Sequence, residues 1–222
     1  VQTCALPIYA KKCSEDPSTS PYFLNPDGSY TYFGRTNWVD EAYNDVGFST
    51  IHNIDISGKT DRISYYFSGG YNRQNGMFKY GNDIYNRYNL RTKLQFKLTD
   101  WWSLNSNVSL TTSDYDYANA MTNTYRQMYR KNPMDMVKNP DGTWTDASVD
   151  TLGALAEGGR ATDWKTNTNI NLSTKIDVIK DVFFVQGTFA FSNTKTRSNW
   201  YNLPVTYRNG PELPVLTFNP IS

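Results

Sequence analysis

The stretch from Arg87 to Leu98 reads RYNLRTKLQFKL and carries the clearest structural signal in the sequence. Apolar and polar side chains alternate along it almost without a break. One side carries the apolar set, which is Tyr88, Leu90, Leu94, Phe96 and Leu98. The other side carries the charged row Arg87, Arg91, Lys93 and Lys97. A period of two residues is typical of a β-strand with one apolar and one polar face. The stretch therefore predicts a long amphipathic strand.

Five further stretches show the same alternation, which predicts six strands in all. They are Ile54 and Ile56 with their polar neighbours, Ile63 to Tyr71, Trp101 to Thr112, Trp164 to Asp177 and Val182 to Ser192. We expect strands of about 10 to 14 residues, whereas strands in soluble proteins cluster near 5–6 residues and a tilted membrane-crossing strand needs about 9–11. The length favours strands that cross a membrane.

The connections between these strands alternate between short and long. Short turns are expected at 58–61, 99–100 and 179–181, and long loops at about 73–83 and 113–163. Outer-membrane β-barrels place short turns on the periplasmic side and longer loops outside. The polar faces are rich in asparagine, which ordinary strands disfavour but which suits a wet lumen. Trp101, Trp102, Phe183 and Phe184 directly follow short turns, where a barrel places its aromatic girdle.

Composition excludes several functional classes. Of 222 residues, 22 are Lys or Arg and 21 are Asp or Glu, so a formal net charge of +1 disfavours nucleic acid as a partner. No run reaches the roughly 20 apolar residues of a spanning helix. One histidine, His52, and two cysteines, Cys4 and Cys13, are too few for a metal site built on several imidazoles or on four thiolates. We expect no cofactor, no bound metal and no catalytic residue. Asp114 and Asp116 resemble an acid–base pair, but solvation of a loop explains them better.

The long connection from 113 to 163 carries its own signals. Met121, Tyr125, Met128 and Tyr129 fall on one face of a helix that Pro133 ends, and a second short helix is expected from Ala147 to Glu157. The hexads NPDGSY at 25–30 and NPDGTW at 139–144 predict tight turns. Aromatic rings here either contact cargo or a partner, or hold the loop together. The candidate contact residues are Tyr115, Tyr117, Tyr125, Tyr129 and Trp144.

The first residues do not follow the strand pattern. Residues 1–8 read VQTCALPI, which resembles translated sequencing-adapter sequence. We expect residues 1–12 to be a non-native or disordered segment, and residues 13–222 to be part of a β-barrel domain in a longer protein.

Several short segments occur in an order that resembles the SusC/RagA-like family of TonB-dependent outer-membrane transporters from Bacteroidota. In chain order they are TNWVDE at 36–41, GFSTIHN at 47–53, ISG at 56–58, YYFSG at 65–69, NGM at 75–77, NRYNLR at 86–91 and LTDW at 98–101. The resemblance covers roughly residues 20 to 200. It implies an all-β antiparallel meander of six long strands, just after the plug domain, within a 22-stranded transmembrane β-barrel.

The resemblance also implies a function. Members import oligosaccharides or peptides through the outer membrane, beneath a SusD-like surface lipoprotein and with energy delivered by TonB through the plug. The charged row from Arg87 to Lys97 then faces the plug or water in the lumen, although a solvated exterior face remains open. The alternative function is a soluble carbohydrate-binding β-sandwich, in which the apolar face is buried by a second sheet.

Overall fold

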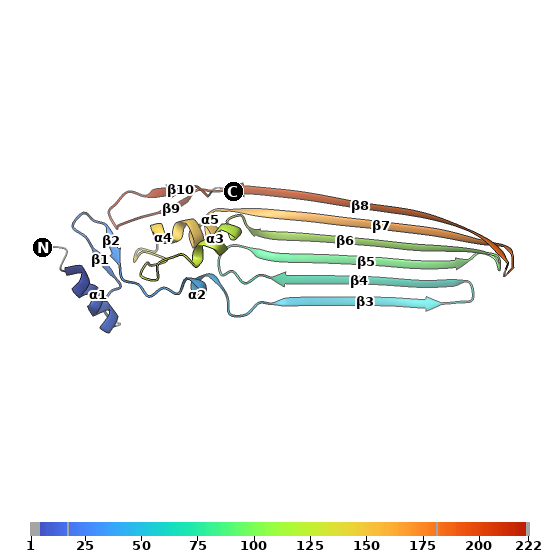
Figure 1. Ribbon diagram of the computed structural model, residues 1–222, viewed down its shortest axis with the longest axis horizontal. Helices are drawn as coiled ribbons and strands as arrows, with labels where there is room; N and C mark the ends of the chain where they lie inside the picture. Colours follow the sequence, from blue (N-terminus) through green and yellow to red (C-terminus); the bar gives the residue numbers. More distant parts are fainter. Residues whose placement is uncertain (1–4, 17, 181, 221–222) are drawn as a thin grey trace.

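Six strands, β3 to β8, form one antiparallel sheet in which each strand pairs with its sequence neighbours (Figure 1). The computed structural model describes residues 5–16, 18–180 and 182–220. The sheet is an open meander with β3 and β8 at its edges. Its strands are β3 (Ser49–Lys59), β4 (Ile63–Asn75), β5 (Asp83–Lys97), β6 (Trp102–Ala118), β7 (Gly159–Ile179) and β8 (Phe183–Asn202). The predicted all-β meander of six long strands is confirmed.

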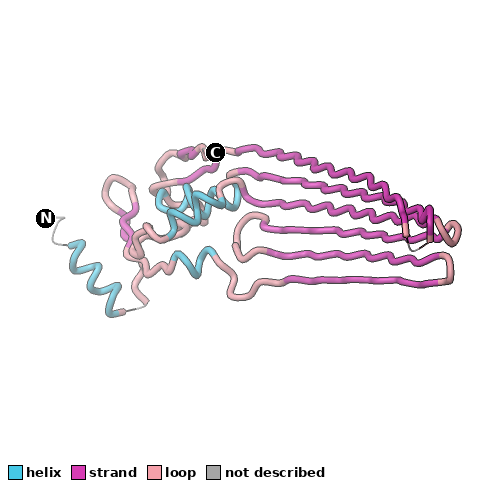
Figure 2. Tube along the Cα trace, turned by 45° about the vertical axis from the view of Figure 1, so that its right-hand side comes forward, coloured by secondary structure: helices cyan, strands magenta, loops and turns pink. Residues whose placement is uncertain are grey.

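The remaining elements gather at the loop end of the sheet, opposite its three short turns (Figure 2). Both chain ends lie there as well (Figure 1). Two small hairpins pair β1 with β2 and β9 with β10. These elements are α1 (Ala5–Glu15), β1 (Tyr22–Leu24), β2 (Tyr30–Tyr32), α2 (Trp38–Ala42), α3 (Met121–Met128), α4 (Asp146–Ser148), the π-helical turn η2 (Val149–Gly153), α5 (Ala154–Glu157), β9 (Val205–Tyr207) and β10 (Leu216–Phe218).

The strands run further toward the loop end than the sequence pattern indicates. β4 and β5 leave only residues 76–82 between them, and β6 and β7 leave 119–158. The expected loop bounds of 73–83 and 113–163 are therefore too wide. The reason is that both faces of β6 and β7 become polar there, as at Asp114, Asp116 and Thr162. The hydrophobic period disappears while the backbone pairing continues.

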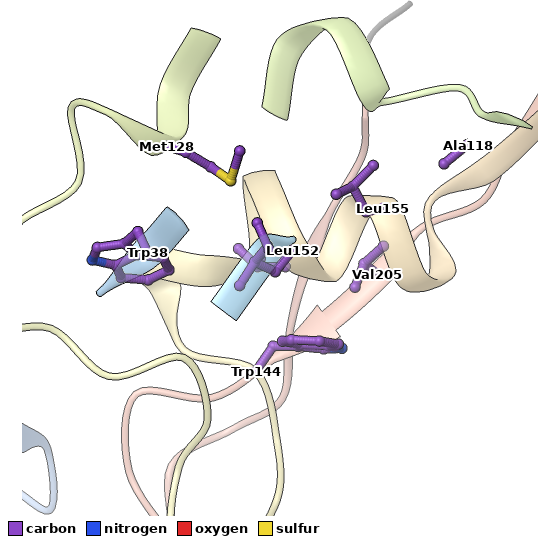
Figure 3. Close-up of a cluster of buried hydrophobic side chains, with 9 residues drawn as sticks. Trp38, Ala118, Met128, Trp144, Leu152, Leu155 and Val205 are labelled. Atoms are coloured by element: carbon purple, nitrogen blue, oxygen red, sulfur yellow. The ribbon is translucent and has the colours of Figure 1, made fainter. Parts of the chain in front are cut away.

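A buried cluster at the loop end, which we call the loop-end core, holds the irregular segments together (Figure 3). Val149, Leu152 and Leu155 contribute one face of the predicted second helix, which the structure builds as α4, η2 and α5 in succession. The other buried members are Trp38, Ala42, Ala118, Met128, Trp144 and Val205. They come from α2, β6, α3, the 139–144 turn and β9, so this core joins segments that are distant in the sequence.

Gly159 connects the loop-end core to the sheet. It follows α5 and Gly158, and it begins β7 with φ of 119°, a conformation that L side chains rarely adopt. A Cβ atom there would lie 2.1 Å from the carbonyl oxygen of Tyr201 on β8. A glycine is therefore required where the helical segment turns directly into the longest strand.

The two NPDG hexads fold into the same turn, as predicted. Gly28 and Gly142 adopt φ of 83° and 84°. In each turn the aspartate accepts hydrogen bonds from the residue two positions on. Asp27 Oδ1 accepts from the backbone N–H (2.9 Å) and hydroxyl (2.6 Å) of Ser29. Asp141 Oδ1 accepts from the same groups of Thr143 at 3.0 and 2.6 Å. The turns connect through Tyr32, whose hydroxyl donates to Asn139 Oδ1 at 2.6 Å.

The N-terminal segment differs in part from the expectation. Residues 5–12, expected to be non-native or disordered, belong to α1. Tyr9 of this helix packs on Phe23 and Phe33, with ring centroids 5.6 and 5.4 Å apart. Residues 1–4, including Cys4, lie outside the described residues, and the origin of the segment stays a prediction.

Candidate functional site

The six-stranded sheet presents one apolar and one polar face. We call apolar face the side that bears Leu90, Leu110, Ile170 and Phe189, and polar face the side that bears Arg91, Ser109, Asn171 and Thr188. Leu90 and Phe189 are 54% and 58% exposed. Within the described part of the chain, no second layer covers the apolar face (Figure 1). The second sheet that a sandwich requires is therefore missing from residues 5–16, 18–180 and 182–220.

The apolar side chains form a band whose height is close to that of the lipid-facing band of outer-membrane barrels. On β6 its apolar side chains run from Trp102 to Leu110, roughly 27 Å along the strand at about 3.4 Å per residue. A strand tilt of about 40° reduces this to roughly 21 Å, against a lipid-facing band of about 25 Å in outer-membrane barrels. Beyond Leu110 the same side carries Thr112, Asp114 and Asp116.

The upper edge of this apolar band is slanted relative to the strand pairing. Tyr71, Tyr88 and Lys195 lie on one cross-strand row, through Thr112 and Thr166. On β4 and β5 the band reaches this row, whereas on β8 it ends at Phe191, four residue pairs nearer the turns. A horizontal boundary on tilted strands must cross the pairing rows obliquely. The slant therefore agrees with strands that are tilted relative to a flat apolar layer.

Aromatic residues mark both edges of the band. At the turn end, Trp102 and Phe183 lie on the apolar side, 38% and 52% exposed, and the Trp101 ring stacks on Trp102 with centroids 6.2 Å apart. Phe184, which the sequence also predicted for this girdle, pairs with Asp177 on the polar side, where its ring centroid lies 4.7 Å from Lys175 Nζ. At the loop end, sequence reasoning missed a second group formed by His52, Tyr71 and Tyr88. The His52 and Tyr71 rings stack at 6.4 Å, and the Tyr71 and Tyr88 rings at 5.0 Å. Girdles of aromatic residues at both interfaces are typical of membrane barrels.

The polar face is hollowed at mid-height. A hollow of about 400 Å³ is lined by Arg91 and Lys93 of the predicted charged row and by Asn105, Asn107 and Asn171. Arg91 Nε donates to Asn107 Oδ1 at 3.4 Å, and Lys93 Nζ lies 5.8 Å from the centroid of the Tyr66 ring. The asparagine rows and the basic row thus share one polar, positively charged surface.

Tyr115 and Tyr117 lie together at the loop end of the polar face. Their rings stack with centroids 4.6 Å apart. The Tyr115 hydroxyl donates to Asp83 Oδ1 at 3.0 Å, and the Tyr117 hydroxyl donates to Asp163 Oδ2 at 3.2 Å. Sequence reasoning missed both aspartates because it assigned them to loops. Extending the two-residue alternation of β5 and β7 by a few residues would have placed both aspartates on the polar face.

The other candidate contacts lie elsewhere. Tyr125 and Tyr129 project from α3, 56% and 63% exposed, with their rings edge to face at 5.9 Å. Trp144 is only 4% exposed, so its expected exposure is wrong. Its indole packs in the loop-end core, donates from Nε1 to Glu157 Oε1 at 2.9 Å and lies beneath Lys138 Nζ at 4.3 Å. The structure does not bring the five candidates together, and a contact role for the four tyrosines stays a proposal.

Several pKa values at the loop end are shifted by burial or by hydrogen bonds within turns. Burial raises the pKa of Tyr32 to about 12. Burial likewise raises the pKa of Asp135. The hydroxyl and backbone N–H of Thr143 lower the pKa of Asp141, and Ser29 does the same for Asp27. Each shift follows from a turn or a buried contact that stabilises the fold.

Neither a metal-binding cluster nor a membrane-spanning helix occurs in the described residues. Across 5–16, 18–180 and 182–220, no three histidine, cysteine or acidic side chains gather where they would hold a metal ion. In the same residues, no helix has the length and apolarity that crossing a bilayer requires.

The chain is similar in fold to parts of known transporters. A RagAB peptide importer chain in its closed-closed state matches with a TM-score of 0.62 and 16% identity, over 93% of this chain and 23% of that one. A chain of the open-open state matches with a TM-score of 0.60 and 17% identity, over 88% of this chain and 22% of that one. A third chain, from a RagAB peptide transporter structure, matches with a TM-score of 0.53 and 18% identity, over 89% of this chain and 23% of that one. No family model and no curated protein matches. The chain spans less than a quarter of these structures, and the likeness shows the fold.

Replacing Trp144 tests whether its role is structural. Trp144→Ala removes a buried indole and its hydrogen bond, so we expect the free energy of unfolding of the purified protein to fall by about 3–5 kcal/mol. Tyr129→Ala, the control on exposed α3, should change stability by less than about 0.5 kcal/mol. Denaturant or thermal unfolding measures both. Equal, small effects would contradict the burial of Trp144.

Proposed function

We propose that this chain forms part of the wall of a transmembrane β-barrel in an outer-membrane nutrient transporter. One observation carries the proposal, which is the uncovered apolar band bordered by aromatic residues on both sides. Exposed apolar patches beyond a few hundred Å² are rare on soluble monomers. Acyl chains of a membrane are the partner that such a tall, slanted band fits best. The likeness to RagAB importer chains supports the same assignment.

Closure requires more strands than the sheet contains. The outer edges of β3 and β8 are unpaired among the described residues. A backbone edge within lipid leaves polar groups unsatisfied, so spanning sheets must close. Barrels with an aqueous channel need about 16 strands and plugged transporters about 22. The remaining strands and the plug belong, in this proposal, to other parts of the 22-stranded parent protein.

The polar face then lines the lumen. Arg87, Arg91, Lys93 and Lys97 face water or the plug, and the asparagines around them keep the wall hydrated. Tyr115 and Tyr117 lie near the lumen mouth, where they are placed to contact cargo. Tyr125 and Tyr129 lie on the exposed surface of the loop end, where a SusD-like surface lipoprotein would dock.

The cargo class follows from the resemblance and not from a pocket. SusC/RagA-like transporters import oligosaccharides or peptides with energy from TonB, and the similar solved structures are peptide importers. We therefore place peptides first and oligosaccharides second.

The soluble carbohydrate-binding sandwich has no observation in its favour. Its core would be the apolar face, and that face is open in the described part of the chain.

Charge placed on the two faces should have opposite consequences. Leu172 pairs with Ser106 at the middle of the apolar band, and Asn171, its neighbour on β7, lies on the polar face opposite Asn107 and Ala190. Leu172→Arg puts a guanidinium into lipid, which destabilises the assembled barrel by about 2–4 kcal/mol. Asn171→Arg, the matched control, should assemble normally. Denaturant unfolding of the intact protein in vesicles, with the amount recovered from outer membranes, measures both. Normal assembly of Leu172→Arg would contradict a lipid-facing Leu172.

Transport should depend on the proton gradient. In cells that carry the intact protein, uptake of a labelled peptide mixture should fall to background when a protonophore collapses the gradient. Deletion of the gene should give the same loss. Uptake that persists without the gradient would contradict TonB-driven transport and leave the barrel assignment intact.

A further inference from the structure

Four exposed cations follow one another along the polar face of β5, an interior strand of the sheet. They are the charged row Arg87, Arg91, Lys93 and Lys97. From the first to the last, the strand covers roughly 34 Å, or about 26 Å along the barrel axis at a tilt of about 40°. This is close to the height of about 25 Å that a lipid-facing band has. In the proposed barrel, the charged row therefore extends along the lumen over the whole height of the membrane-facing wall.

The strands beside the charged row leave most of its charge uncompensated. β5 pairs with β4 on one side and β6 on the other, so its lateral neighbours are all present. Asp55 on β3 shares a cross-strand row with Arg91, two strands or roughly 10 Å away, and accepts a hydrogen bond from the Tyr66 hydroxyl at 2.8 Å. Within residues 5–16, 18–180 and 182–220, no ion pair joins any of the four cations to a carboxylate. Positive charge therefore exceeds negative charge on this part of the polar face.

Two of these cations meet at the hollow of the polar face. Lys93, Tyr66 and Asn107 share one cross-strand row. Lys93 leans toward β4, where its Nζ lies 5.8 Å from the centroid of the Tyr66 ring. Arg91 pairs with Ser109, yet its Nε donates to Asn107 Oδ1 at 3.4 Å, so the guanidinium leans into the same row from the side of β6. Neutral partners thus hold one cation on each side of the hollow without cancelling its charge.

We propose that the charged row selects acidic peptides as cargo, and that Arg91 and Lys93 bind a peptide carboxylate at the hollow. This inference rests on the proposed function, because it requires the polar face to line the lumen of a transporter. A cleft lined by one sign of charge concentrates ligands of the opposite sign and accelerates their association by about 10- to 10³-fold. A guanidinium donates two parallel hydrogen bonds to a carboxylate, and the adjacent ammonium adds charge.

The length of the charged row favours a moving ligand over a fixed one. A protein segment docked against the wall would pair with the cations at one height, whereas the row continues over about 26 Å. Successive cations lie two or four residues apart, roughly 7 or 14 Å along the strand. Their long, flexible side chains offer a carboxylate a series of contacts at different heights. Such a series suits a peptide that passes along the wall.

Uptake of two peptides of opposite charge tests this selectivity. Cells that carry the intact protein receive a labelled hexapeptide with glutamate at alternate positions, or its counterpart with lysine. We expect the acidic peptide to enter at least about tenfold faster. Arg91→Gln/Lys93→Gln should reduce this preference to about threefold, because half of the charged row remains. Lys195→Gln/Arg197→Gln, the matched control, removes the same two residue types at the same spacing from the other face of the sheet and should keep the full preference.

Two measures separate lost selectivity from poor assembly. Uptake is expressed per amount of protein recovered from outer membranes. Arg91→Lys/Lys93→Arg retains both charges and should retain the preference.

The remaining outcomes separate this proposal from the proposed function. Equal uptake of both peptides by the wild-type protein, or an unchanged preference in Arg91→Gln/Lys93→Gln, overturns the selectivity while transport stands. Equal loss of both peptides in that variant assigns the row to a contact within the parent protein, such as the plug, and overturns its role in cargo selection. Competition by trigalacturonate as strong as that by the acidic peptide overturns the assignment to peptides. Failure of the wild-type protein to import either peptide contradicts the proposed transport function and this inference together.

Discussion

An apolar sheet face without a protein partner is the feature on which the rest of the structure depends. Burying apolar surface is worth about 25 cal/mol per Å², so leaving six strands of Ile, Leu, Val and Phe in water is a large unfavourable term. The described chain offers no layer that removes this term. Helices α2 to α5 pack instead into the loop-end core, away from the band, and α1 packs on Phe23 and Phe33 near the β1–β2 hairpin (Figure 2). In the proposed barrel, acyl chains cover this face, and the slanted band and its aromatic borders agree with tilted strands in a bilayer.

The second feature is the division of each long strand into two parts. Near the turns, one face is apolar and the other wet. Toward the loop end, both faces are polar, and contacts such as the Asp116–Arg160 ion pair and the Tyr115–Asp83 hydrogen bond replace apolar packing. The loop-end core then fixes the long connection against the ends of the strands. In the proposed barrel, this aromatic-rich surface would lie beyond the membrane, at the end where cargo and a partner protein would arrive.

Much of this could be predicted from the sequence, for physical reasons. Period-two alternation reports which residues share a face, so the strands, their order and both faces followed from stretches such as Arg87–Leu98. The helix with Val149, Leu152 and Leu155 followed from its spacing. The strand ends could not be predicted in this way. At Asp114, Asp116 and Thr162 both faces are polar, so the two-residue hydrophobic alternation disappears. Trp144 was misplaced because a turn signal says nothing about which side chains the turn buries. The girdle of His52, Tyr71 and Tyr88 was missed because it exists only across paired strands.

Site-directed spin labelling at two adjacent positions of β7 tests whether the apolar face contacts lipid and the polar face contacts water. Leu172 lies on the apolar face and Asn171 on the polar face. Leu172→Cys and Asn171→Cys would each carry a nitroxide in the intact protein reconstituted in vesicles, with Cys4 and Cys13 replaced by serine. We expect the label at 172 to collide mainly with oxygen, which partitions into acyl chains, and the label at 171 mainly with a water-soluble nickel chelate. Equal access of the nickel chelate to both positions would contradict a lipid-facing apolar band.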